Sequence, residues 1–290
     1  MISIIICSRK KTLSKALSDN IKQTIGTAFE IIVIDNSESR YSIFEAYNIG
    51  VKKSRYPYLC FMHDDIKYYT HNWGLIVLEH FKGDKVGAIG IAGTPYMPYL
   101  PGSWWCSNLV NMHILQNNMQ INERSSHKYP PATGTRNKVS VLDGVWFCIA
   151  KRLFADITFD EVNYSGFHFY DIDISMQVGR AGYDLFCVFD IVVEHFSNGN
   201  VDKKWQENAF VFNRKWRSVL PAACIPISYS SRCEAELRTL QEFTKILITN
   251  GLSPKKAYRT AFFTLLKYAN IYFQPKTIAH LCRYSFKSIF

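Results

Sequence analysis

The chain has 290 residues, of which 48% are apolar and 20% are charged, so it can bury a substantial core. This composition excludes a disordered tail, and the lack of an 18-residue apolar run excludes an ordinary membrane-spanning protein. The formal net charge of +10 comes mainly from residues 243–290, which carry eight basic side chains and no acidic ones, whereas the rest is nearly balanced.

Strand-like and helix-like patterns alternate through the first ninety residues. Short apolar or β-branched runs predict buried strands at 4–7, 30–34, 58–62 and 86–91. Apolar residues at helical spacing predict helices between them, at 13–26, 46–53 and 73–81. This alternation predicts an α/β fold with a mixed, mainly parallel sheet flanked by helices, in which ligands bind at the carboxyl ends of the strands.

The pattern dissolves at residues 93–138, which contain five prolines and the pair Trp104-Trp105. We expect a long functional loop here, with the paired tryptophans packed on another surface. Order returns afterwards, with apolar or periodic segments at 139–149, 171–182, 185–193 and 205–216. We read these as a strand region, a helix, a strand and a helix, and assign the regularly spaced aromatic residues of the last helix to the core.

Pro221 and Pro226 mark a boundary, after which the chain predicts three helices, at 233–249, 254–270 and 275–288. We therefore divide the chain into a domain at 1–220 and a basic, aromatic-rich helical segment at 221–290. A basic amphipathic helix can lie on an anionic membrane, where each nearby cation contributes about 1 kcal/mol. The alternative is an appendage packed on the domain or on a second copy of the chain.

The eight cysteines include no CxxC pair. Cys7, Cys60 and Cys187 lie inside apolar runs, which indicates buried free thiols in a reducing compartment. The N-terminal apolar stretch spans only five residues and precedes Arg9, the reverse of the order in a secretory signal. We therefore expect a cytoplasmic chain.

The triplet His63-Asp64-Asp65 directly follows a predicted buried strand. Two neighbouring carboxylates repel each other unless a cation or a set of donors relieves the repulsion, and oxygen ligands suit Mg²⁺ or Mn²⁺. A solvated turn or a helix cap is the structural alternative. Polar residues also follow two other strands, Ser8-Arg9 and Asp35-Asn36, and this coincidence favours a functional site at the same edge of the sheet.

Three further positions could carry chemistry. Asp171 opens a predicted helix, where an acidic residue either interacts with the helix dipole or acts as a general base toward a substrate hydroxyl. His195 follows the last predicted core strand and is either a hydrogen-bonded structural residue or a metal ligand that joins Asp65. The segment Asp143-Gly144-Val145-Trp146 is either a turn that opens a strand or a polar floor for a sugar.

Segments with this chemistry occur in the order expected of a known family. They comprise 4–9, 31–36, 48–50, 61–65, 142–144 and 170–173, with Gly182 and His195. Through them the chain resembles a family 2-like glycosyltransferase with the GT-A fold. The resemblance covers residues 1–220; each motif is weak alone, and their order and spacing together are fairly specific.

The resemblance implies roles in donor binding. Ser8, Arg9 and Asp35 would surround the nucleotide base and ribose, and Asn48 would lie beside them. The triplet that begins with His63 is similar to the DxD metal motif of the family. In that motif Asp65 would bind the metal that bridges the donor diphosphate, Asp64 occupies the variable middle position, and His63 replaces the Asp that normally contacts ribose.

The resemblance also implies roles in catalysis. Asp171 would be the general base of a Glu-Asp pair in which Tyr170 replaces Glu. His195, near the end of the domain, would be a ligand of the metal or the diphosphate. A single base without a carboxylate nucleophile fits direct displacement with inversion. The rings of Trp104 and Trp105 would either stack on the acceptor sugar or serve simple packing or an oligomer contact. Asp143, Gly144 and Trp146 would form the polar floor for the sugar.

The implied protein is a metal-dependent inverting glycosyltransferase that uses Mn²⁺ or Mg²⁺ and a nucleotide-diphosphate sugar, with a UDP-sugar favoured. Its acceptor would be a hydroxyl of a glycan or of a lipid-linked acceptor in cell-surface polysaccharide synthesis. The chain would then lie in the cytoplasm or peripherally on the inner face of the membrane, and a homo-oligomer is a further candidate assembly.

Other classes of function fit the sequence less well. A catalytically inactive GT-A scaffold that acts as a binding protein is left open by His63 and Tyr170. Nucleic-acid binding is not expected, because zinc-finger spacing and RNP-like aromatic motifs are absent from the sequence. A nucleotidyltransferase would show a Gly-rich basic loop after the first strand, where this chain has Cys7-Ser8-Arg9.

Overall fold

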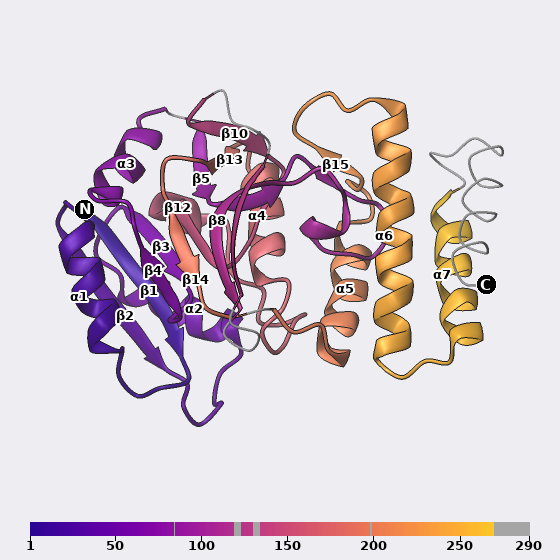
Figure 1. Ribbon diagram of the computed structural model, residues 1–290, viewed down its shortest axis with the longest axis horizontal. Helices are drawn as coiled ribbons and strands as arrows, with labels where there is room; N and C mark the ends of the chain where they lie inside the picture. The colour runs from indigo at the N-terminus through magenta and orange to yellow at the C-terminus, as the bar shows by residue number, and fades with distance from the viewer. Residues whose placement is uncertain (84, 119–122, 130–133, 198, 270–290) are drawn as a thin grey trace.

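The computed structural model describes residues 1–290 apart from 84, 119–122, 130–133, 198 and 270–290. A central seven-stranded sheet is flanked by helices, and two C-terminal helices stand side by side at one end of the molecule (Figure 1). This mixed α/β architecture confirms the predicted fold class.

The central sheet has the strand order β10-β13-β5-β12-β3-β1-β2. Its strands are β1 (Ile2–Ser8), β2 (Phe29–Asp35), β3 (Tyr58–Met62), β5 (Val86–Gly90), β10 (Arg136–Val139), β12 (Trp146–Ala150) and β13 (Asp184–Val188). β1 pairs in parallel with β2 and β3, and β5 pairs in parallel with β13. β12 runs antiparallel between β3 and β5, so the sheet is mixed and two parallel groups share one direction.

Five helices accompany this part of the chain: α1 (Lys15–Thr24), α2 (Ile43–Lys53), α3 (Trp73–His80), α4 (Tyr170–Arg180) and α5 (Lys203–Trp216). Local sequence defines their starts, since Ser42 and Glu45 form a reciprocal capping box on α2. Gly50 lets α2 approach β1 closely, because a Cβ at this position would lie 2.3 Å from Cγ2 of Ile5. The helices predicted at these positions are confirmed, with their ends shifted by a few residues.

A second sheet has the order β11-β6-β8-β14-β4, with β9 paired to β8. Its strands are β4 (Ile66–Tyr68), β6 (Ala92–Thr94), β8 (Asn111–Asn118), β9 (Glu123–Tyr129), β11 (Val141–Leu142) and β14 (Val193–His195). The predicted long loop at 93–138 is therefore wrong, because this stretch contains β8, β9 and parts of β6 and β10. β8 and β9 are polar strands held by backbone pairing, which apolar patterning does not detect.

The predicted strand at 185–193 is also corrected. Its residues divide between two sheets, with β13 in the central sheet and β14 in the second. The connection between them lies at residues 189–192. This division carries His195 away from the central sheet and beside β4.

The C-terminal helices are α6 (Tyr229–Thr249) and α7 (Pro254–Ala269), and α6 runs between α5 and α7 (Figure 1). The buried carboxylate of Glu236 on α6 accepts hydrogen bonds from the Tyr96 hydroxyl and from the backbone N–H groups of Tyr99 and Leu100. α6 is thus packed on the preceding domain. The helix predicted at 275–288 lies outside the described residues.

Short elements complete the described chain: β7 (Tyr96–Met97), β15 (Ala222–Ala223), and the 3-10 helices η1 (Trp104–Cys106) and η2 (Lys151–Ala155). β15 pairs with β7, which ties the start of the C-terminal segment to the middle of the chain. Among the described helices, none combines the length and the apolar character that a bilayer-crossing helix requires.

Candidate active site

The polar residues after the first strands meet at one edge of the central sheet, as expected. Ser8 ends β1 opposite Asp35 of β2, and its buried hydroxyl donates a hydrogen bond to the Asp64 carboxylate. Asp35 and Arg9 are exposed. The backbone N–H of Ser37 donates to Asp35 and lowers the pKa of that carboxyl. This edge therefore offers an open polar surface next to the His63 triplet.

His63, Asp65 and His195 form a compact cluster. Oδ1 of Asp65 lies 3.5 Å from Nε2 of His195 and 3.9 Å from Nδ1 of His63. One potential ligand atom from each residue lies within 4.8 Å of the others. The pairing of β14 with β4 creates this cluster, because it sets His195 opposite Ile66 and lets the Phe196 N–H donate to the Asp65 carbonyl.

The hydrogen bonds behind the two histidines define which ring nitrogens face the cluster. The Tyr170 hydroxyl donates to the Gly144 carbonyl at 3.1 Å, so its oxygen accepts a hydrogen bond from Nε2–H of His63 at 3.2 Å. Nδ1 of His63 then carries its lone pair toward Nε2 of His195, 3.3 Å away. This tautomer is inferred from the hydrogen-bond network.

Gln116 orients the second histidine in the same way. Its Nε2 donates to the Ser197 carbonyl at 2.7 Å, which leaves Oε1 as the acceptor for Nδ1 of His195 at 3.3 Å. Nε2 of His195 then presents its lone pair to the cluster. Metal-binding histidines are commonly held by such a bond on the opposite ring nitrogen, so the cluster suits a divalent cation.

The charge states also suit a cation. Burial opposes ionisation of Asp65, but the neighbouring His195 side chain, a hydrogen bond from Ser197 and the nearby His63 outweigh it and lower the pKa of the carboxyl. Burial lowers the pKa of the His63 imidazole, with a smaller contribution from His195 and opposition from the nearby carboxylates. The cluster thus combines an anionic carboxylate with a neutral imidazole, the protonation states that metal ligands require.

A cavity of about 320 Å³ adjoins the cluster, and His63 forms part of its wall. We call it the aromatic cavity, after the rings that line it. The residues that line it also include Trp104, Trp105, Asp143, Gly144, Phe167, His168, Phe169, Tyr170, Asp171 and Trp205. Asp171 and the cluster of His63, Asp65 and His195 therefore adjoin one cavity through His63.

Asp171 has the properties of a general base. It lies in the first turn of α4, and the Gly144 N–H donates to its carboxylate. Burial, together with the negative charge of Asp143, raises the pKa of Asp171 to about 7, although backbone hydrogen bonds oppose the rise. A carboxylate with a pKa near neutrality can accept a proton efficiently at physiological pH.

The segment after β11 shapes the floor of the aromatic cavity. Gly144 is required there, because a Cβ would lie 2.1 Å from the Tyr170 hydroxyl. The Asp143 carboxylate accepts hydrogen bonds from Nε1 of Trp104 at 2.7 Å and from the Val145 N–H at 2.9 Å. Asp143 thus fixes η1, which carries both Trp104 and Trp105, beside the cavity.

Two of the predicted site residues take structural positions instead. Trp146 is fully buried, packs against Trp73 and donates from Nε1 to the Tyr68 hydroxyl, so the prediction of a sugar contact is wrong. The Asn48 amide donates to the Phe159 carbonyl and accepts from the Thr158 hydroxyl. These bonds fasten the segment at 158–161, and the position of Asn48 beside the nucleotide stays a prediction.

Several residues of the aromatic cavity are not indicated by the sequence pattern. Helical spacing assigns Trp205 to the core; it is buried, yet its ring packs 6.3 Å from Trp105 at the cavity wall. Phe167, His168 and Phe169 also line the cavity. Their position directly before Tyr170-Asp171 is the signal that could have identified them.

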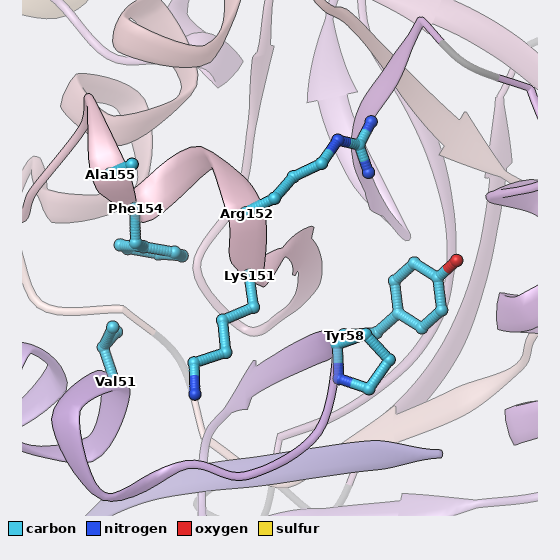
Figure 2. Close-up of a pocket in the computed structure, with 7 residues that line it drawn as sticks. Val51, Tyr58, Lys151, Arg152, Phe154 and Ala155 are labelled. Atoms are coloured by element: carbon cyan, nitrogen blue, oxygen red, sulfur yellow. The ribbon is translucent and has the colours of Figure 1, made fainter.

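A second cavity, of about 560 Å³, lies at the opposite end of β3 and is shown in Figure 2. Lys151 and Arg152 leave η2 in different directions, and the Lys151 amine donates to the Ser54 carbonyl at 2.6 Å. The two cations do not converge on a common point. This cavity contains none of the predicted site residues.

Comparisons with known proteins agree with this geometry. Residues 3–216 match the model of the glycosyltransferase-like family. No curated protein sequence matches this chain significantly. The structure of residues 1–349 of TarS from S. aureus is similar with a TM-score of 0.54 and 13% identity, covering 97% of this chain and 82% of that one.

GalNAc-T7, solved with UDP, GalNAc and Mn²⁺, is similar with a TM-score of 0.51 and 13% identity. The match covers 87% of this chain and 58% of that one, so this chain spans little more than half of its length. At these identities the likeness shows the fold, which is that of the GT-A glycosyltransferases. The match over residues 3–216 establishes that this chain belongs to the glycosyltransferase-like family.

Proposed function

We propose that the protein is a metal-dependent, inverting glycosyltransferase. It would transfer a sugar from a nucleotide-diphosphate sugar, with a UDP-sugar favoured, to a hydroxyl of a glycan or lipid-linked acceptor. The observation that carries the proposal is the shared cleft, in which His63 belongs both to the metal-binding cluster and to the wall beside Asp171.

Each protein group has a defined task in this reaction. Ser8 and Asp64 lie with Asp35 at the open edge of the sheet, where they can contact the nucleotide. His63, Asp65 and His195 would hold a divalent cation, which when bound stabilises negative charge on the leaving diphosphate. Their mixed nitrogen and oxygen donors favour Mn²⁺ over Mg²⁺, since Mg²⁺ prefers oxygen ligands alone.

Asp171 would accept the proton of the acceptor hydroxyl as that hydroxyl attacks the anomeric carbon. The bond to the new acceptor oxygen forms as the bond to the diphosphate oxygen breaks. We assign no protein nucleophile, so the reaction proceeds in one displacement with inversion. The rings of Trp104, Trp105 and Trp205 offer flat surfaces to sugar C–H groups.

A thermal-shift panel tests the donor site. UDP-, GDP-, CDP- and dTDP-sugars are each added with and without Mn²⁺, and one nucleotide is expected to stabilise the protein only with the metal. Transfer to a sugar acceptor then tests catalysis. Equal melting temperatures in all samples would contradict the donor site, whereas metal-dependent binding without transfer to a broad acceptor panel would favour an inactive binding scaffold.

We also propose that the C-terminal segment touches an anionic membrane from the cytoplasmic side, where a lipid-linked acceptor in polysaccharide synthesis would lie. The described part of α7 supports this, because exposed Phe262 and Phe263 share the helix with exposed Lys255, Lys256 and Arg259. Co-sedimentation with phosphatidylglycerol vesicles should fall when Phe262 and Phe263 are both changed to Ser. Unchanged sedimentation would contradict the contact.

A further inference from the structure

The aromatic cavity contains negative charge and ring surfaces but little positive charge. Asp143 and Asp171 both line it, whereas no Lys or Arg occurs among its described lining residues. This contrasts with the chain as a whole, which has 34 basic residues. Burial lowers the pKa of the His168 imidazole more than the nearby Asp202 raises it, so this residue adds no cation to the wall.

The rings are arranged around the carboxylates. The distance between ring centroids is 5.2 Å for Phe169 and Trp205, 6.3 Å for Trp205 and Trp105, and 5.7 Å for Phe167 and Tyr170. Ring faces carry partial negative charge, so they attract cations and C–H groups rather than anions. The carboxylates and the ring faces of the wall therefore both favour neutral or positively charged groups over anions.

From this wall, and resting on the proposed function, we infer that the acceptor sugar is uncharged or carries an amine, and that the cavity rejects sugars bearing a carboxylate or a phosphate. A cation held at His63, Asp65 and His195 would already be engaged by the donor diphosphate. Because the donor would use the charge of that cation, the acceptor would face the carboxylates of Asp143 and Asp171. These carboxylates would repel an anionic sugar, and specific binding sites use such like-charge repulsion to exclude wrong ligands.

The size of the cavity limits the acceptor as well. About 320 Å³ lies at the lower end of the range of about 300–1,000 Å³ for ligand pockets. The cavity thus suits one terminal sugar unit, with the rest of a longer acceptor outside. Its charge preference applies to that terminal unit.

Trp105 provides a direct optical test. The protein has six tryptophans, all within the described residues. Trp105 is 37% exposed, whereas Trp73, Trp104, Trp146, Trp205 and Trp216 are at most 7% exposed. Quenching of tryptophan fluorescence by acrylamide, a neutral quencher, therefore reports mainly on the cavity wall, and the variant Trp105→Phe shows which part of the signal comes from this residue.

The experiment uses the full chain with Mn²⁺ and UDP, and compares methyl glucoside with methyl glucuronide, methyl galactoside with methyl galacturonide, and glucosamine as the amine. The neutral sugar of at least one pair, or glucosamine, should protect Trp105 from quenching. The matching uronide should require about tenfold or more higher concentration for the same protection. Equal protection by both members of a pair would overturn the charge preference, and lack of protection by every sugar would overturn the assignment of the cavity to such an acceptor.

A positive charge added at the exposed edge of the cavity should shift this preference toward the uronide. Asn200 is exposed and lines the cavity, so Asn200→Lys should increase uronide binding relative to the neutral sugar, while Asn200→Gln should leave the ratio unchanged. An unchanged ratio in Asn200→Lys would count against the proposal. Thermal stabilisation by nucleotide and Mn²⁺ is measured in the same samples, so failure of the proposed function is recognised separately by the loss of that stabilisation.

Discussion

Nε2 of His63 lies 3.2 Å from the hydroxyl oxygen of Tyr170, the residue directly before Asp171. This contact joins the cluster that can hold a cation to the helix that carries the candidate base. The same hydroxyl donates to the Gly144 carbonyl, while the Gly144 N–H donates to Asp171. Tyr170 and Gly144 therefore couple the geometry of the two halves of the site.

Removing the Tyr170 hydroxyl should weaken metal binding without removing a ligand. In Tyr170→Phe, Nε2 of His63 loses its partner, and the loss of such a bond typically lowers metal affinity about 10–100-fold. A calorimetric titration with Mn²⁺ in the presence of nucleotide measures the change. Tyr164→Phe is the matched control, because its hydroxyl donates to Asp173 and not to the cluster. Equal affinities in Tyr170→Phe and the unmodified protein would contradict this role.

Asp65→Ala should abolish metal-dependent nucleotide binding and transfer together. The carboxylate is the anionic member of the cluster, and two imidazoles alone offset little of the cost of dehydrating a divalent cation. The measurement is the thermal shift produced by nucleotide with Mn²⁺. Asp19→Ala offers a comparison, since Asp19 is a surface carboxylate that pairs with Lys15 and lies outside both the cluster and the proposed nucleotide contacts, and this variant should retain the Mn²⁺-dependent stabilisation. Full Mn²⁺-dependent stabilisation of Asp65→Ala would remove that residue from the site.

Asp171→Asn should lower kcat about 10²–10⁴-fold while leaving donor affinity nearly unchanged, since general-base catalysis contributes about this factor. The base acts only when ionised, so kcat/KM of the unmodified enzyme should rise with pH through about 7, the pKa of Asp171. Steady-state kinetics across this range measures both effects. A variant with full activity would exclude Asp171 as the base.

Asp173, two residues further on, should affect stability rather than catalysis. Its fully buried carboxylate accepts hydrogen bonds from Trp216 at 2.8 Å, Tyr164 at 3.1 Å and Lys215 at 2.9 Å. Asp173→Ala leaves Trp216 and Tyr164 without this acceptor, whereas Lys215 keeps its contact with Asp160. The change should lower the free energy of unfolding by about 2–5 kcal/mol, measured by urea denaturation. Asp19, which pairs with Lys15 at the surface, is the control, and its replacement by Ala should leave the urea midpoint nearly unchanged.

Glu236 should give the protein a measurable dependence of stability on pH. Burial raises the pKa of this carboxyl from 4.5 to about 7, against the hydrogen bonds from residues 96–100. The folded protein therefore retains a proton that the unfolded chain releases, and the free energy of unfolding falls as pH rises from about 4.5 to about 7. A shift of this size corresponds to about 3 kcal/mol.

The variant Glu236→Gln isolates this contribution. It removes the titrating group, so the difference in unfolding free energy between the unmodified protein and the variant should change across that pH range. Urea denaturation at several pH values measures it. A constant difference from pH 4.5 to 7 would contradict the raised pKa of Glu236 in the folded state.

The sequence alone determined the alternation of buried strands and helices, and with it the edge of the sheet where chemistry lies. Apolar runs report burial, and parallel strands end at one edge, so the pattern of residues is sufficient to place Ser8, Asp35 and His63 there. Asp171 is identified in the same way, by its position at the start of a predicted helix. These inferences depend on local patterns, which the sequence records directly.

Only the tertiary structure decided how distant residues meet. The pairing of β14 with β4 brings His195 to 3.5 Å from Asp65, and the polar strand β8 supplies Gln116 behind it. Trp146 faces the core and Trp205 the aromatic cavity, although both are buried aromatic residues. The hydrophobic pattern of the sequence predicts that a side chain is buried. Which residues this side chain contacts, and which face of the sheet or helix it occupies, depend on backbone pairing between segments far apart in the chain.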